Sequence, residues 1–154
     1  MNSTLFAAMP LISCQAGQVI IEEGQPIQGI YFLESGEVEI RKGGVLIAEV
    51  YESGAVLGEM SHLLKTQPMA TVKTLTPCRL RHVADPETYF RQYPEVTLYM
   101  AEILARRLDS MSRYLVDIKL QFKDRADHFG IIDEVLDALM HKHPRNIPRR
   151  SAGD

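Results

Sequence analysis

The stretch from Leu57 to Val72, LGEMSHLLKTQPMATV, holds the residues best suited to binding a phosphorylated ligand. Gly58 would let the backbone approach a ligand closely, and the N–H groups at the start of the short helix after it favour an anion. Glu59 is the carboxylate that opens this helix. Taken alone, the pair also fits a plain turn followed by a helix whose dipole favours an acidic first residue, so both interpretations stay open at this point.

The remaining chemistry-bearing residues do not predict a catalytic or metal site. No Ser, His or Asp forms a recognisable nucleophile–base pair, and no paired carboxylates stand out, so we expect no enzyme activity. Cys14 and Cys78 lie far apart and outside any CxxC spacing, which favours two unlinked, partly buried thiols over a disulfide. His141 and His143 have no acidic or cysteine partner nearby and are interpreted as a solvated helix end.

Short strands must position the Leu57–Val72 stretch. Gly- and Pro-containing turns recur at short intervals through the first two-thirds of the chain. The β-forming runs between them are Val19–Ile21, Ile30–Leu33, Val38–Ile40, Val45–Val50, Ala70–Leu75 and Arg79–Val83. Many short strands at roughly ten-residue spacing predict a compact all-β barrel or sandwich.

Helical signals replace this pattern from Asp85 onward. Asp85 and Pro86 form an N-cap followed by a proline at the first helical position, and Pro94 marks a second helix start. Apolar residues of the long helix then recur at alternating spacings of three and four. This seam consists of Ala101, Leu104, Leu108, Met111, Leu115, Ile118 and Phe122. The helix could pack on the β-domain, but a narrow heptad seam favours a homodimer through a parallel two-helix coil.

The bulk composition is that of an ordinary globular protein. The chain has 154 residues and a formal net charge of −3, which gives no general reason to expect nucleic acid or an anionic membrane as partner. No apolar run approaches the roughly 20 residues that span a bilayer, and no signal pattern is present, so we expect a cytoplasmic protein. Residues 131–140 predict one more amphipathic helix, and the polar tail after it predicts disorder.

The segment Ile20–Ile40, IIEEGQPIQGIYFLESGEVEI, carries a resemblance to a known family. It places two hydrophobic residues, a Gly turn at Gly24, an apolar strand at Ile30–Leu33 and a second glycine at Gly36. This spacing resembles the cyclic-nucleotide-binding domain shared by the cAMP-receptor/FNR regulators, protein kinase A regulatory subunits and gated channels. Ile27 departs from the pattern, which usually has a small residue at that position.

The Leu57–Val72 stretch resembles the family's phosphate-binding cassette, which reads apolar-Gly-Glu-x-small-apolar, then a short loop, then Arg-small-Ala-x-apolar. Leu57–Ser61 fits the first half, and Ala70–Val72 fits the end of the second. The resemblance implies that Glu59 accepts a hydrogen bond from a ribose 2′-hydroxyl. The implied ligand-binding residues are Gly58, Glu59, Met60, Ser61, Ala70 and Thr71.

Three residues depart from the cassette. Pro68 stands at the position of the family's arginine, Met69 replaces the small residue after it, and His62 replaces an apolar residue. The arginine neutralises the cyclic phosphate, so its loss costs several kcal/mol, or about two to three decades of affinity. Lys65 is the nearest cation on the loop and the candidate to compensate.

The resemblance implies an α+β, mainly β fold: a jelly-roll-like β-roll with a short N-terminal helix and a long C-terminal dimerisation helix. We expect the β-roll in residues 1–93, the coiled-coil-type helix in residues 94–124, and a short amphipathic helix with a flexible tail in residues 125–154. Too little chain follows the long helix for the winged helix of the transcription factors, so we expect a stand-alone domain without sequence-specific DNA binding.

The leading functional hypothesis is a non-catalytic sensory module that couples a small-ligand pocket to a dimer helix and is read by a partner protein. No cofactor is required, and cAMP or cGMP is the candidate ligand. The alternative is a degenerate, ligand-free interaction and dimerisation module, in which Pro68 and Met69 mark a pocket closed by its own side chains. A third hypothesis places a different small effector in the same barrel.

Overall fold

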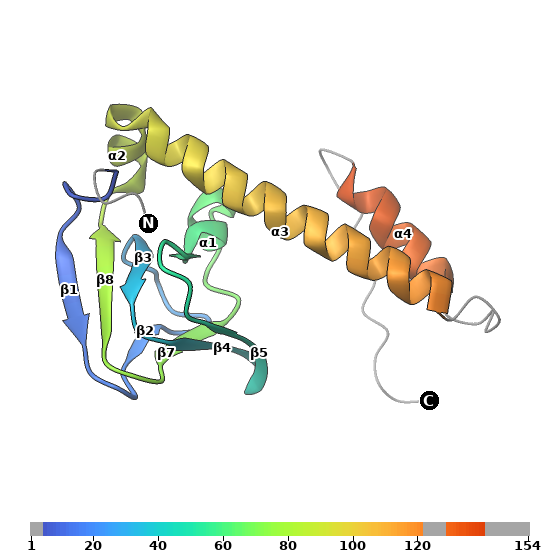
Figure 1. Cartoon of the computed structure of the whole chain (residues 1–154), viewed down its shortest axis with the longest axis horizontal. Helices are drawn as coiled ribbons and strands as arrows, with labels where there is room; N and C mark the ends of the chain where they lie inside the picture. The colour runs from blue at the N-terminus through green and yellow to red at the C-terminus, as the bar shows by residue number, and fades with distance from the viewer. Residues whose placement is uncertain (1–4, 122–128, 141–154) are drawn as a thin grey trace. The chain divides into compact units, whose positions relative to one another are not determined.

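The structure is a computed structural model that describes residues 5–121 and 129–140. They fall into two compact units, which divide between Ile103 and Leu104. The strands are β1 (Leu11–Cys14), β2 (Val19–Ile21), β3 (Ile30–Ser35), β4 (Val38–Lys42), β5 (Val45–Val50), β6 (Val56–Leu57), β7 (Thr71–Thr74) and β8 (Cys78–Val83). The helices are α1 (Glu59–Leu64), α2 (Pro86–Gln92), α3 (Pro94–Gln121) and α4 (Phe129–Leu139), as Figure 1 shows.

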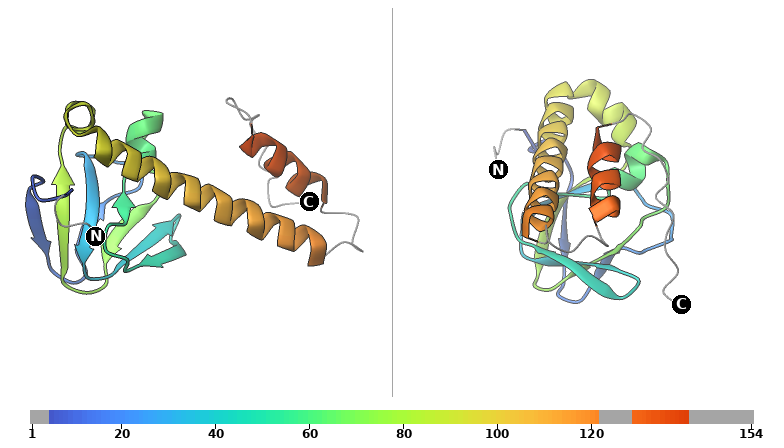
Figure 2. Two further views of the ribbon diagram at one scale, coloured as in Figure 1. Left: turned by 45° about the horizontal axis from the view of Figure 1, so that its top comes forward. Right: turned by 90° about the vertical axis from the view of Figure 1, so that its right-hand side faces the viewer.

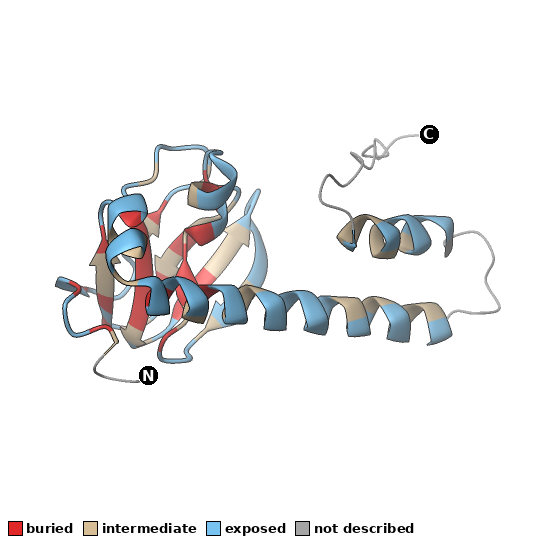
Figure 3. Ribbon diagram, turned by 90° about the horizontal axis from the view of Figure 1, so that it is seen from above, coloured by how far each residue is buried: buried red, intermediate tan, exposed pale blue. Residues whose placement is uncertain are grey.

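The first unit is a β-roll made of two antiparallel four-stranded sheets, with strand orders β1-β8-β3-β6 and β2-β7-β4-β5. The two sheets face each other, because the core cluster combines Leu33 and Leu80 from the first sheet with Val38 and Val72 from the second. Figure 2 gives two further views of this arrangement, and Figure 3 shows that most of the buried residues lie on the strands of the roll. The expected mainly β fold with a long helix is confirmed.

Strand β3 is buried on both faces, which explains its four consecutive apolar residues. Tyr31 and Leu33 belong to the cluster inside the roll. On the opposite face the Phe32 ring lies 5.1 Å from the Phe6 ring, which in turn makes an edge contact with Tyr99 of α3 at 5.2 Å. A strand covered on both sides has no wet face and therefore no polar alternation.

The first turns of α3 belong to the β-roll. Val96 and Met100 are fully or almost fully buried within the first unit. Asp85 caps α2 as expected, since its side chain accepts a hydrogen bond from the backbone N–H of Thr88, and Pro86 occupies the first turn. Hydrogen bonding to Thr88 also holds the pKa of Asp85 below its usual value.

One expectation about the N-terminal half needs correction, and two strands there were not predicted. Residues 5–9 form turns rather than the short helix that the resemblance implied. A single hydrogen bond from Met9 N–H to the Phe6 carbonyl closes this segment, and Pro10 then leads into β1. Strands β1 and β6 were not predicted from the sequence, because β6 has only 2 residues and the 4 residues of β1 show no alternating pattern.

The second unit contains the rest of α3 and α4. The helix expected over residues 131–140 is present, and an ion pair between Lys119 and Asp133 joins it to α3. Of the predicted seam, Leu108 is 42% and Met111 52% exposed, whereas Leu104, Leu115 and Ile118 are half-buried. Phe122, the last member of the seam, lies outside the described residues, as does the tail from residue 141.

Candidate functional site

Gly58 sits at the junction of β6 and α1 and is required there for two reasons. Its backbone is left-handed, with φ at 86°, a conformation that side chains with a Cβ rarely adopt. A methyl group placed on Gly58 would also lie 2.5 Å from Cδ1 of Ile27 and 3.1 Å from Cδ1 of Ile21. The glycine therefore permits a close approach to its backbone, and the atoms that make this approach are isoleucine side chains.

Helix α1 turns some of the predicted ligand residues inward and others outward. Glu59 is only 3% exposed and Ser61 is also buried, so both belong to the inner side of the first turn. Met60 lies between them and is 47% exposed, while His62 is half-buried. A buried carboxylate at a helix start is consistent with a residue that receives hydrogen bonds there, either from the protein or from a ligand.

Lys65 ends α1 in a left-handed conformation, with φ at 54°. The backbone N–H of Lys65 donates to the carbonyl of His62 at 3.3 Å, and that of Thr66 donates to the carbonyl of Ser61 at 3.0 Å. These bonds close the last turn of the helix in the manner of a Schellman motif. The Lys65 residue is exposed, so its position is decided by helix termination rather than by burial.

The second half of the cassette is fastened to the turn that follows β2. The Pro68 carbonyl accepts a hydrogen bond from Gly24 N–H at 2.9 Å, and Thr71 Oγ1 accepts one from Glu23 N–H at 3.1 Å. Pro68 is buried, Ala70 and Thr71 are half-buried, and the adjacent Met69 is exposed. The position where the resemblance implies an arginine thus holds a buried, uncharged ring, and the backbone carbonyl of the same residue is hydrogen-bonded within the fold.

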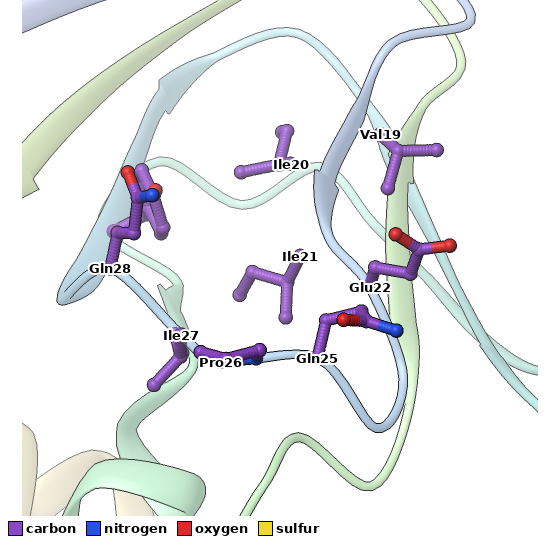
Figure 4. Close-up of a pocket in the computed structure, with 9 residues that line it drawn as sticks. Val19, Ile20, Ile21, Glu22, Gln25, Pro26, Ile27 and Gln28 are labelled. Carbon is purple, nitrogen blue, oxygen red and sulfur yellow. The ribbon is translucent and has the colours of Figure 1, made fainter.

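A pocket of about 350 Å³ lies beside this region and was not predicted from the sequence. Its lining consists of Val19, Ile20, Ile21, Glu22, Gln25, Pro26, Ile27, Gln28 and Tyr31. Figure 4 shows that most of these side chains come from β2 and from the loop that leads into β3. None of the predicted ligand residues lines it, although the departure of Ile27 from the family pattern had marked the loop as unusual.

Tyr31 provides the aromatic wall of this pocket. Its ring stacks on the His82 ring with centroids 4.6 Å apart and planes 15° from parallel. Burial raises the pKa of the Tyr31 hydroxyl, with a smaller contribution from the nearby Cys14 thiol. The Tyr31 hydroxyl therefore stays protonated near neutral pH and can act as a hydrogen-bond donor.

The loop before β6 connects the site to α3. The Tyr99 hydroxyl donates to the Gly54 carbonyl at 3.0 Å, and Gly54 N–H donates to the Leu33 carbonyl at 2.7 Å. Leu33 N–H in turn donates to the Ala55 carbonyl at 2.8 Å. Gly54 is therefore held by both α3 and β3, and only β6 separates this short loop from Gly58 and Glu59.

The two cysteines are closer than their separation in sequence suggested. Cys14 and Cys78 are free and buried, and they stand directly opposite each other in the β1–β8 register. Burial, and secondarily the neighbouring Cys78, raises the pKa of the Cys14 thiol. In the parts of the chain that the structure describes, no cluster of His, Cys, Asp and Glu is arranged to hold a metal ion. His141 and His143 lie outside those parts.

Comparison with known proteins agrees with this architecture. The sequence model described as "Cyclic nucleotide-binding domain" matches residues 11–91. The chain is 32% identical over 107 residues to the Pycsar effector protein XpPycTIR of Xanthomonas perforans, a match that covers 68% of this chain and 35% of that protein. It is 30% identical over 112 residues to Lysophospholipase NTE1 of Chaetomium globosum, covering 68% of this chain and 7% of the relative.

Among solved structures, the Catabolite Activator Protein of Thermus thermophilus is similar in fold. Its TM-score is 0.60 at 24% identity, with 79% of this chain and 58% of that chain covered. The matches to the two curated relatives named above cover 35% of the length of XpPycTIR and 7% of that of Lysophospholipase NTE1, so the chain spans only a small part of each relative. Among the described residues, no helix is both long and apolar enough to cross a membrane.

Proposed function

Because this chain belongs to the cyclic nucleotide-binding domain family, we propose that it is a non-catalytic regulatory module that couples a small-ligand site at Gly58 and Glu59 to α3. In this proposal the β-roll is the sensory part. Helix α3 is the output, and two copies of the chain associate through its seam. A ribose-bearing nucleotide of the cyclic type is the candidate ligand.

The observation that carries this proposal is the hydrogen bond from the Tyr99 hydroxyl to the Gly54 carbonyl. A ligand at Gly58 and Glu59 would shift the start of α1, which directly follows β6. Since β6 is only 2 residues long, such a shift would reach the Gly54 loop without passing through a larger element. Tyr99 would then transmit the movement of Gly54 to the root of α3. Ligand binding can act on the output only through a contact of this kind, which differs between the two states.

The ligand side of the proposal rests on the cassette's first half. The left-handed Gly58, the buried Glu59 and the first N–H groups of α1 give a ribose hydroxyl and an anion suitable partners. The buried Pro68 supplies no counter-charge for a phosphate. We therefore expect affinity about two to three decades below that of a site with the arginine present.

Calorimetric titration of the purified chain with cAMP and cGMP tests this function. We expect weak binding that saturates only toward millimolar nucleotide. The 2′-deoxy form of cAMP is the matched control ligand and should bind more weakly still, because Glu59 loses its hydroxyl partner. Absence of heat with both cyclic nucleotides at millimolar concentration would exclude the cyclic-nucleotide version of the proposal.

A second candidate is a ligand-free interaction module, and the contact of Ile27 and Ile21 with Gly58 favours it. In such a module the protein's own side chains occupy the position of the ligand, and the function depends only on self-association of the chain. This candidate expects the titration above to be silent while the chain still self-associates. Sedimentation velocity of the same sample, with and without nucleotide, separates the two candidates.

Self-association through α3 is the remaining part of the proposal. Leu108 and Met111 are apolar and 42% and 52% exposed, which leaves a side of the predicted seam open to a second copy. Exposed apolar residues also occur off the seam, at Leu98, Tyr114, Val116 and Leu120. The heptad spacing, rather than exposure alone, therefore selects which side pairs.

A further inference from the structure

The Ile27 side chain lies on the backbone that a ligand of this family would need to reach. The nearest neighbour of a methyl group placed on Gly58 would be Cδ1 of Ile27, at 2.5 Å, followed by Cδ1 of Ile21 at 3.1 Å. At such distances Ile27 covers the Cα atom of Gly58 directly. Ile21 is part of β2 and buried, whereas Ile27 is half-buried in the loop between β2 and β3.

The loop that carries Ile27 is held at both ends. On its N-terminal side, Glu23 and Gly24 are bonded to Thr71 and Pro68. On its C-terminal side, the Gln28 carbonyl lies 2.5 Å from Nε2 of His82. Because these anchors flank Ile27 closely, the cheapest movement available to it is rotation of its side chain rather than opening of the loop.

Space for this rotation exists next to Ile27. The same side chain lines the pocket of about 350 Å³, together with Pro26 and Gln28 (Figure 4). Tyr31 also lines this pocket. Ile27 therefore has Gly58 on one side and the pocket on another. A side chain in this position can cover the Gly58 backbone in one rotamer and leave it open in a different one.

We propose that Ile27 is a side-chain gate on the ligand site, and that its Cδ1 atom must leave Gly58 before a ribose-bearing nucleotide can reach the backbone of Gly58 and the carboxylate of Glu59. This inference rests on the proposed function, since a gate has meaning only where a ligand enters. Its energetic consequence is a reduction of apparent affinity by the fraction of molecules with the gate open. Ile27 is thus a residue that lowers affinity independently of the missing phosphate counter-charge.

The test measures binding in a background where binding is strong enough to compare. Pro68→Arg supplies the counter-charge, and cAMP and cGMP are titrated into Pro68→Arg with and without a change at Ile27. Ile27→Val removes Cδ1 alone and Ile27→Ala removes more of the side chain. We expect Ile27→Ala to tighten binding about tenfold and Ile27→Val to tighten it by less. A shorter side chain buries less apolar surface against Gly58, so less burial is lost when it moves aside for the ligand.

Ile12→Val is the matched control for Ile27→Val. Ile12 is also a partly buried isoleucine packed against the core, but it lies on β1 opposite Leu80 of β8 rather than in the loop that faces Gly58. Its substitution should leave nucleotide affinity unchanged in the same background. Equal affinity of the Pro68→Arg protein with isoleucine, valine and alanine at position 27 would overturn the gate.

A second readout does not depend on binding by any variant. In methyl-labelled wild-type protein, we expect a nuclear Overhauser effect between the Ile27 δ1 methyl group and the Hα protons of Gly58. Absence of this effect would refute the gate even if nucleotide binds. If the effect is present and no variant binds nucleotide, the proposed function fails in its cyclic-nucleotide form, and Ile27 is then a fixed plug rather than a gate.

Discussion

Replacing Tyr99 with phenylalanine tests the connection between the site and α3. The change keeps the ring that contacts Phe6 and removes only the hydroxyl that donates to the Gly54 carbonyl at 3.0 Å. Loss of one such hydrogen bond costs about 1 kcal/mol, which raises the local opening equilibrium of the Gly54 loop roughly fivefold. With a urea dependence of about 2 kcal/mol per molar, the unfolding midpoint would fall by about 0.5 M.

Amide hydrogen exchange measures this effect where it should occur. The Gly54 N–H is bonded to the Leu33 carbonyl, so faster opening of the loop should accelerate exchange in peptides that contain Gly54–Leu57. Tyr114→Phe is the matched control, because Tyr114 lies on the same helix and is 66% exposed. Unchanged exchange at Gly54–Leu57 in Tyr99→Phe, or an equal change in Tyr114→Phe, would refute the connection between the Gly54 loop and α3.

Three further predictions concern stability and association. Hydrogen bonding by Arg81 holds the pKa of the Glu34 carboxyl below its usual value. The stability that ionised Glu34 contributes is therefore complete above the unfolded pKa of about 4.3 and is lost as pH falls through the folded pKa. Glu34→Gln should flatten this acid-side loss of stability in urea titrations, and a pH profile parallel to that of the wild type would contradict the prediction. Oxidation with diamide should join Cys14 to Cys78, which face each other in the β1–β8 register, and should raise the free energy of unfolding from urea titrations by up to about 4 kcal/mol. Absence of the crosslinked peptide in mass spectrometry would count against this prediction. Leu108→Glu should lower the dimer fraction in sedimentation velocity, whereas Val116→Glu, which is off the seam but equally exposed, should not; equal effects would argue against the seam.

Much of the β-roll follows from local signals. The two-residue turn Gly43-Gly44 has positive φ at both positions, 55° and 81°, as a tight hairpin requires, and it joins β4 to β5. Asp85 and Pro86 begin α2 as the capping pattern predicted. By contrast, β6 could not be predicted, because 2 residues carry no periodicity and Val56 and Leu57 form a strand only by pairing with β3.

The sequence predicted which residues belong to the candidate site, but it did not predict which side chains pack around them. Gly58 and Glu59 begin α1 as expected, and the departures at Pro68 and Ile27 were visible as residue types. What those departures do depends on contacts between segments distant in sequence. The Pro68 ring is buried where its backbone carbonyl accepts a hydrogen bond from Gly24 N–H, and Ile27 covers Gly58, which is 31 residues further along the chain.

The sequence by itself determined the family, six of the eight strands, the long helix, and the loss of the phosphate-binding charge at Pro68. These properties depend on residue type and spacing, which determine local backbone conformation and charge. The tertiary structure alone decided that Cys14 faces Cys78, that Tyr99 holds Gly54, and that Ile27 rests on Gly58. Each of these contacts joins residues from different elements, and only the pairing and packing of the two sheets bring such residues within reach.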